Sequence, residues 1–209
     1  MNVLIVDDHA VVRRGLAEIL SDEFSGVRVG QADDAAEARR CLRERDWNLA
    51  IVDIALPGES GLMLLKEIRD TWPGVPVLVL SFHPEKRYAL RALRAGAAGY
   101  LTKETAPDEL VSAVRKVLGG GKYVTASIAE RLAFKVEEGG GEAPHERLSD
   151  REYQVMIRLA SGKTVSQIAD EMHLSVNTIS TYRSRLLEKM GMETNAEVTR
   201  YAVENELTD

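Results

Sequence analysis

Five short apolar runs, alternating with segments of helical periodicity, limit most strongly what this chain can fold into. The runs are residues 2–6, 27–32, 49–52, 75–80 and 99–101, and the amphipathic segments are residues 10–20, 35–45, 60–72, 84–95 and 107–118. Three runs are solidly apolar, as in strands that are covered on both faces. The pattern predicts an α/β fold with a doubly wound, five-stranded parallel sheet and right-handed crossovers. Ligands of such sheets bind beyond the carboxyl ends of the strands.

A second, all-helical region follows a break in this pattern. One more helix is expected over residues 126–136, and the next segment, EEGGGEAPHE, has no periodicity. We interpret residues 122–147 as a linker with a helix and a flexible Gly-rich stretch, whose ten aperiodic residues would span roughly 16–19 Å. Residues 148–209 are predicted to form a small all-α domain of four helices, with a helix-turn-helix pair at 164–172 and 176–190. Residues 1–121 form the first expected domain.

Composition excludes several classes of protein. Hydrophobic residues make up 44% of the chain and charged residues 29%, which is typical of globular domains. The apolar runs are too short to span a bilayer, and the start of the chain lacks the basic region of a signal peptide. A single cysteine, Cys41, excludes an internal disulfide and a cysteine zinc site. We therefore expect a cytoplasmic protein that does not associate with membranes.

Acidic residues stand at the ends of two predicted strands that should be neighbours. Asp7 and Asp8 follow the first strand and Asp53 follows the third, so three carboxylates should converge at the switch point of the sheet. Carboxylates at such short distances repel one another unless a cation lies between them. Oxygen ligands of this kind suit Mg²⁺. Lys103 and Ser81 end the fifth and fourth strands and add an ammonium and a hydroxyl. This combination suits a phosphoryl group whose charge is neutralised from several sides.

The first region resembles the receiver domain of bacterial two-component response regulators, which has a flavodoxin-like fold. The residues that carry the resemblance are Asp7-Asp8, Asp53 within IVDIALPG, Ser81, and Gly99 to Lys103, GYLTK. The resemblance implies that a sensor histidine kinase phosphorylates Asp53. It also implies the ligands of Mg²⁺ or Mn²⁺, which would be Asp8, Asp53, the backbone carbonyl of Ala55 and, through water, Asp7. Lys103 would pair with the phosphoryl oxygen, and Ser81 and Tyr100 would be the switch pair.

An enzyme is the main alternative to a signalling domain. Haloacid-dehalogenase-like phosphatases also have an aspartate nucleophile and Mg²⁺ at a strand end. They carry a second acid two residues after the nucleophile, where this chain has Ala55. No residue is then placed to protonate a leaving group, so we expect no turnover of external substrates.

The second region resembles the LuxR-type helix-turn-helix of NarL/FixJ response regulators. The residues that carry the resemblance are LSDRE at 148–152, Gly162, Ile168-Ala169, Leu174-Ser175, Thr178-Ile179, Tyr182-Arg183 and KMG at 189–191. The resemblance implies a transcription regulator that binds double-stranded promoter DNA, and it argues against an RNA-binding or protein-binding bundle. A sensor of a lipid signal would instead need an apolar cavity in the first domain, which the acidic pocket contradicts.

The helix expected at 176–190 can be divided into faces at 100° per residue. Ile179, Leu186 and Met190 share the inner face, with Arg183 at its edge. The N-terminal part of such a helix reads base edges. The predicted DNA contacts are Ser180, Thr181, Ser184, Arg185 and Lys189, together with Thr164 and Thr178.

The charge of this second region predicts that it binds DNA as a dimer. Residues 145–209 contain 8 basic and 11 acidic residues, a net charge of −3, so the region lacks the basic surface of most DNA-binding domains. Affinity must come from a few placed contacts and from a homodimer on DNA. The candidate dimer interface consists of Val198, Tyr201 and Ala202. Alternatively, these residues only pack within the helical bundle of their own domain.

Overall fold

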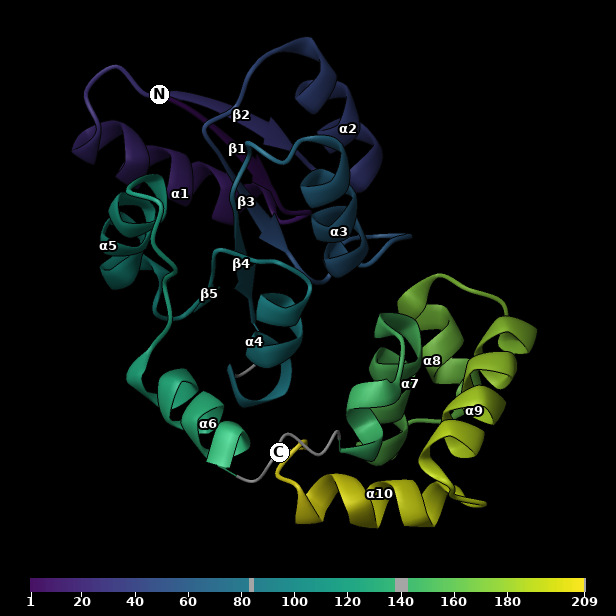
Figure 1. The fold of residues 1–209 in the computed structure, drawn as a ribbon. Helices are drawn as coiled ribbons and strands as arrows, with labels where there is room; N and C mark the ends of the chain where they lie inside the picture. Colours follow the sequence, from purple (N-terminus) through teal and green to yellow (C-terminus); the bar gives the residue numbers. More distant parts are fainter. Residues whose placement is uncertain (83–84, 138–142, 209) are drawn as a thin grey trace. The chain divides into compact units, whose positions relative to one another are not determined.

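The computed structural model describes residues 1–82, 85–137 and 143–208 (Figure 1). The chain divides into two compact units, Met1–Leu132 and Ala133–Asp209. The Gly-rich part of the predicted linker, residues 138–142, lies outside the described residues. In the part of the chain that is described, no helix is both long and apolar enough to cross a membrane.

The first unit has the predicted doubly wound parallel sheet, in the order β2-β1-β3-β4-β5. Its elements are β1 (Asn2–Val6), α1 (Ala10–Glu23), β2 (Arg28–Ala32), α2 (Ala35–Glu44), β3 (Leu49–Asp53), α3 (Gly61–Thr71), β4 (Val77–Ser81), α4 (Glu85–Arg94), β5 (Gly99–Thr102) and α5 (Ala106–Leu118). Figure 1 shows α1 and α5 on one face of the sheet and α2, α3 and α4 on the other. The fold prediction is therefore confirmed, and the ends of the elements differ from the predicted ones by at most three residues.

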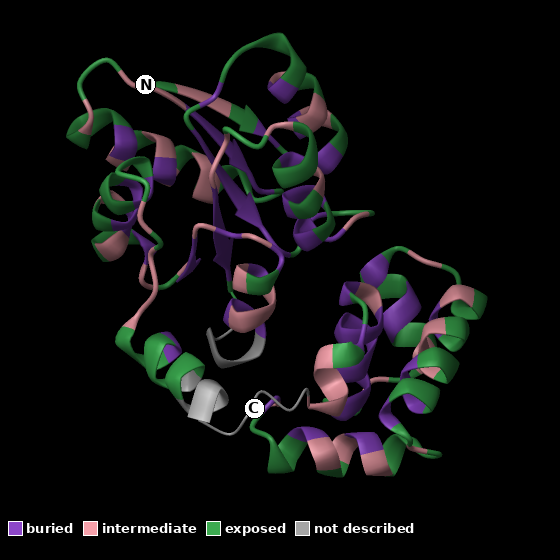
Figure 2. Cartoon of the chain, in the orientation of Figure 1, coloured by how far each residue is buried: buried purple, intermediate pink, exposed green. Residues whose placement is uncertain are grey.

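Burial explains why three of the runs were solidly apolar. Every residue of β3 and β4 is buried, and so are the last four of β1, because helices cover both faces there (Figure 2). The edge strand β2 is mostly exposed or half-buried. The core on the α1/α5 face joins strand residues such as Ile5, Ile51 and Leu80 to helix residues such as Leu20 and Leu110.

The first unit extends beyond residue 121, where we expected the linker to begin. Tyr123 forms an isolated parallel bridge with Gly99, and its amide donates to the carbonyl of Ala98 (2.8 Å). Its hydroxyl donates to Glu109 Oε2 (3.0 Å). A Cβ on Gly99 would lie 2.8 Å from the Cβ of Tyr123, so this close approach requires glycine. Helix α6 (Ala126–Glu137) follows, with Ile128 buried.

The second unit is all-helical, as predicted. Its elements are the 3₁₀ turn η1 (Pro144–Arg147), α7 (Asp150–Ala160), α8 (Val165–Met172), α9 (Val176–Met190) and α10 (Asn195–Glu204). Ser149, Thr164 and Thr194 begin α7, α8 and α10 with capping boxes, and Ser175 caps α9. Such caps satisfy amide groups that have no partner in the first helical turn.

Candidate functional site

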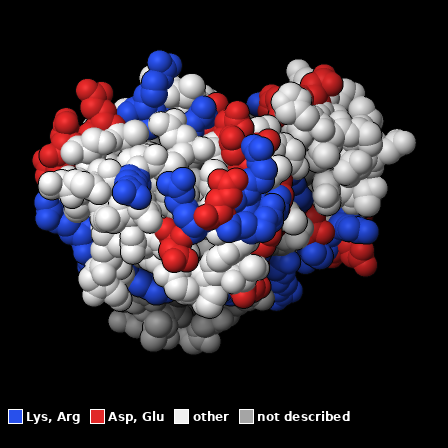
Figure 3. Space-filling view, turned by 90° about the horizontal axis from the view of Figure 1, so that it is seen from above, with Lys and Arg blue, Asp and Glu red and all other residues white. Residues whose placement is uncertain are grey.

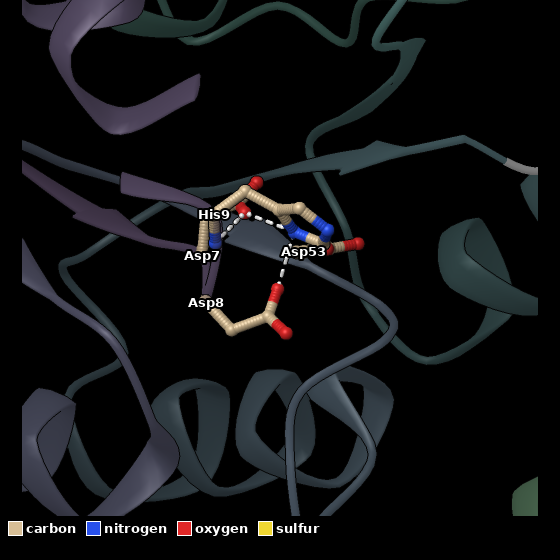
Figure 4. Close-up of side chains that lie close together, drawn as sticks. All are labelled: Asp7, Asp8, His9 and Asp53. Atoms are coloured by element: carbon tan, nitrogen blue, oxygen red, sulfur yellow. Dashed lines mark hydrogen bonds and ion pairs between the residues drawn. The ribbon is translucent and has the colours of Figure 1, made fainter. Parts of the chain in front are cut away.

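The pocket lies where β1 and β3, which are paired neighbours, reach their carboxyl ends. Asp7 follows β1 and Asp53 ends β3, and each is only 1% exposed. Figure 4 shows them beside Asp8 and His9, which are open to solvent. One ligand atom from each of the four residues lies within 4.8 Å of the others. The carboxylates that we expected to converge do so.

Lys103 closes the pocket with a buried ammonium group. Its Nζ lies 2.6 Å from Asp7 Oδ2 and 2.7 Å from Asp53 Oδ2, and its side chain is only 3% exposed. Nζ donates a hydrogen bond to Asp53. The contact with Asp7 is a close charge pair without hydrogen-bond geometry, so Asp7 Oδ2 has no hydrogen-bond partner among the described residues. A buried carboxylate oxygen in that position fits a cation site.

The charge state of Asp53 depends on its burial and on the groups around it. Burial raises the pKa of Asp53 above its usual range, and the ammonium of Lys103 opposes that rise. The carboxylate of Asp7 raises the same pKa further, while the amide of Ala55 lowers it by donating to Asp53 Oδ1 (3.1 Å). Two buried carboxylates next to one ammonium carry excess negative charge, which a divalent cation would neutralise.

The loop from Ile54 to Ser60 holds Asp53 from its other side. The amide of Gly61, which begins α3, donates to the carbonyl of Ile54 (2.9 Å). A Cβ on Gly61 would overlap the carbonyl oxygen of Asp53, so helix α3 can start this close only with glycine. Sequence reasoning missed Gly61, although its place just after the PGES turn was a signal.

His9 is a second residue at the pocket that sequence reasoning missed. Its Nδ1 lies 2.5 Å from Asp8 Oδ1 and 3.2 Å from Asp7 Oδ1, and its amide donates to Asp7 Oδ1 (2.8 Å). Its ring meets that of Phe82 edge to face, at 5.7 Å between centroids. The signal was its position directly after the acidic pair.

The two predicted switch residues stand on the neighbouring strands. Ser81 ends β4 and is fully buried, and its register partner on β5 is Thr102. Tyr100 on β5 is also fully buried, so its ring lies in the inward position. The amide of Lys103 donates to the carbonyl of Ser81 (2.8 Å), which links the ends of β4 and β5.

Helix α9 has the faces that the angular analysis predicted. Ile179, Leu186 and Met190 are buried, whereas four of the predicted DNA contacts are exposed, namely Ser180, Thr181, Ser184 and Arg185. The hydroxyls of Thr181 and Ser184 donate to the carbonyls one turn earlier, at 2.9 and 3.1 Å. Each hydroxyl oxygen can still accept a bond from a base.

Sequence comparison decides what the two units are. Residues 3–115 match the response regulator receiver domain, and residues 146–202 match the bacterial regulatory proteins of the luxR family. The chain is 35% identical to the response regulator UvrY of Escherichia coli over 209 residues, which cover 99% of this chain and 95% of that protein. It is 34% identical to GacA of Pseudomonas aeruginosa, over 100% of this chain and 98% of that one.

The chain belongs to the response regulators of NarL/FixJ type. It has a receiver domain followed by a LuxR-type DNA-binding domain, as the sequence motifs indicated. Solved structures agree with this assignment. RcsB of Salmonella enterica serovar Typhimurium, bound to the rprA promoter with the phosphomimetic BeF₃⁻, matches with a TM-score of 0.66 and 28% identity over 96% of this chain and 97% of that one. A second RcsB structure matches with a TM-score of 0.69 and 27% identity over 98% of both chains.

Three of the residues that we expected on the DNA surface of this response regulator also have bonds within the domain. Lys189 Nζ donates to Glu152 Oε2 (2.6 Å), and Glu152 is itself part of the capping box of α7. Thr164 caps α8, and the hydroxyl of Thr178 bonds with that of Ser175 (2.8 Å). Lys189 in particular ties α9 to α7, which the sequence did not indicate.

The prediction of a dimer interface on α10 is wrong for two of its three residues. Val198 and Ala202 are fully buried in their own bundle, where α10 packs on α7, so they have no surface left for a partner. Tyr201 is half-buried, and its hydroxyl bonds with His145 Nδ1 (2.7 Å). Val203, an apolar residue of the same helix, is 61% exposed.

The face of the response regulator that is seen from above carries charges of both signs. Figure 3 shows Lys and Arg side chains interspersed with Asp and Glu on the face seen from above. This agrees with the net charge of −6.

Proposed function

We propose that this response regulator accepts a phosphoryl group on Asp53 from a sensor histidine kinase and then binds promoter DNA as a homodimer. One observation carries the proposal: the buried carboxylate of Asp53 lies 2.7 Å from Lys103 Nζ, with Asp7 and Asp8 beside it. The RcsB structures with BeF₃⁻ and promoter DNA support the link between the phosphorylated state and DNA binding. This function would place the protein in the cytoplasm.

The proposed reaction uses the residues of the pocket in separate roles. A carboxylate oxygen of Asp53 attacks phosphorus, an oxygen–phosphorus bond forms, and the bond to the imidazole nitrogen of the donor breaks. Asp8, Asp53 and the carbonyl of Ala55 would hold Mg²⁺, with Asp7 acting through water. When bound, the cation would neutralise charge on the phosphoryl oxygens. Lys103 would pair with a phosphoryl oxygen in the same way.

The switch would act through Ser81 and Tyr100. The hydroxyl of Ser81 would bond to the new phosphoryl group, and the ring of Tyr100 would be held in its inward position. Both are fully buried on adjacent strands, and close packing between the two strands would carry a change at one to the other.

Labelling by acetyl phosphate tests the metal-dependent step. The mass of the intact protein should rise by one phosphoryl group with Mg²⁺ and should not change when EDTA removes the metal. Equal labelling under both conditions would exclude the proposed role of the cation.

We expect Thr181→Ala and Ser184→Ala to relax the sequence preference of DNA binding. Each change should cost about 1 kcal/mol at one base pair, at the low end for a base contact, because each hydroxyl already bonds to its own helix. Thr199→Ala is the matched control, since its hydroxyl makes the same bond on α10 (3.0 Å). Binding to a panel of single-base operator variants measures the effect, and an unchanged preference in both variants would remove these residues from the reading surface.

We expect Lys189→Ala to destabilise the DNA-binding domain by about 1–2 kcal/mol at neutral pH, because it leaves the buried Glu152 carboxylate without its cation. Burial alone would raise the pKa of Glu152, but bonds from Lys189 and Ser149 outweigh it and hold that pKa below 4.5. The pair therefore stabilises the fold above about pH 4.5, and this contribution is lost as the pH falls through the lowered pKa. Urea unfolding at pH 7 and at a series of pH values down to about pH 2 measures the difference; a loss of the same size at every pH would contradict the ion pair.

A further inference from the structure

An arginine on α2, outside the acidic pocket, joins three separate segments of the receiver domain. Arg39 Nη2 donates to both carboxylate oxygens of Glu59 (2.9 and 2.8 Å) and to Glu67 Oε2 (2.7 Å). Its Nε donates to both oxygens of Glu67 (3.0 and 2.9 Å). Glu67 is on α3, and Glu59 is in the loop that follows Asp53. We refer to Arg39, Glu59 and Glu67 as the Arg39 cluster.

The Arg39 cluster differs from an ordinary surface ion pair. Its side chains are only 25, 26 and 36% exposed. The hydrogen bond from Arg39 holds the pKa of Glu67 below its usual range, so the pair with Arg39 is charged at neutral pH. A single exposed pair contributes little to stability, but a planar guanidinium held by two carboxylates has a fixed geometry. The cluster can therefore fix the position of a loop.

The loop that Glu59 belongs to is the one that orients Asp53. The amide of Ala55 donates to Asp53 Oδ1, and the carbonyl of Ile54 accepts from the amide of Gly61. Ile54 and Leu56 are buried and anchor the inner part of the loop. Its outer part turns back at Glu59, whose amide donates to the carbonyl of Pro57 (2.8 Å). The carboxylate of Glu59 then ties this outer part to α2 through Arg39.

We propose that Arg39 is a positioning residue for the phosphoryl-acceptor pocket. Through Glu59 it holds the loop at residues 54–60, so that the amide of Ala55 stays on Asp53 and the carbonyl of Ala55 stays fixed at the cation site. The link to Glu67 orients the guanidinium but does not touch the loop. This inference rests on the proposed function, because it concerns the same cation and the same acceptor.

The test compares the two carboxylates that share Arg39. Arg39→Ala and Glu59→Ala should each weaken Mg²⁺ binding about fivefold in calorimetry and speed hydrogen exchange at the amide of Ala55. Glu67→Ala is the matched control: it removes the same charge from the same arginine but should change Mg²⁺ affinity less than about twofold. Arg39→Lys should rescue only in part, because an ammonium cannot bridge both carboxylates in this geometry.

The double variant of Arg39→Ala with Glu59→Ala should be no worse than Arg39→Ala alone, since both remove one link. Circular dichroism checks that every variant stays folded. Equal effects of Glu59→Ala and Glu67→Ala on Mg²⁺ affinity and on exchange at Ala55 would overturn the inference. If the parent protein itself bound no Mg²⁺ and accepted no phosphoryl group, the proposed function would be what had failed.

Discussion

Asp53→Asn should abolish phosphoryl transfer to this protein. An amide cannot form the acyl phosphate, and our proposal assigns the other buried carboxylate at Lys103, that of Asp7, to the cation site. Labelling with acetyl phosphate and Mg²⁺ should fall below detection, which is at least about a hundredfold loss for a missing nucleophile. The fold should remain, because asparagine has nearly the same shape as the residue that it replaces.

Asp7→Asn is the matched control for this prediction. It also removes one buried carboxylate that contacts Lys103, but it leaves the nucleophile in place. We expect this variant to be labelled at saturating Mg²⁺ and to need a higher concentration of the metal. Undiminished labelling of the Asp53→Asn protein would move the acceptor to another residue.

Val198→Glu should unfold the DNA-binding domain. Val198 is fully buried where α10 packs on α7, so a carboxylate at this position would be removed from water. A buried, unpaired charge costs about 3–5 kcal/mol, which is a large part of the stability of a small domain. Thermal unfolding followed by circular dichroism should show that the helical signal of residues 144–208 is lost at room temperature.

Val203→Glu makes the same chemical change on the exposed side of α10 and should leave the domain folded. If the exposed face of α10 pairs two protomers on DNA, this variant should protect only one half-site in footprinting. The parent should protect two, centred roughly 10 base pairs apart. A parent footprint over two half-sites that Val203→Glu does not shorten would place the dimer contact elsewhere.

The fold and the acidic pocket could be predicted because their signals are local. Strands that are covered on both faces must be continuously apolar. The pocket can then be predicted from the polar residues at the carboxyl ends of these strands. The prediction that Asp7, Asp53 and Lys103 meet required no knowledge of side-chain packing, since the topology alone brings the ends of β1, β3 and β5 together.

Contacts between distant segments could not be predicted in this way. A helical wheel shows that Val198 and Ala202 are on an apolar face, but it cannot show whether their own bundle or a partner covers that face. The bond between Lys189 and Glu152 joins residues 37 positions apart. Tyr123 lies in a segment that looks like a linker, and only the glycine opposite, Gly99, lets it approach the sheet edge.

The most direct test of this account is the DNA affinity of one protein in two states. Operator DNA selected by the phosphorylated protein would be labelled with a fluorophore, and anisotropy would be measured with Mg²⁺, in the presence and absence of BeF₃⁻. We expect BeF₃⁻ to tighten binding by about tenfold or more in the parent, a coupling free energy of about 1.4 kcal/mol, and to have no effect on Asp53→Asn. Equal affinity of the parent in both states, with BeF₃⁻ shown to occupy the pocket, would contradict the claim that phosphorylation of Asp53 controls DNA binding.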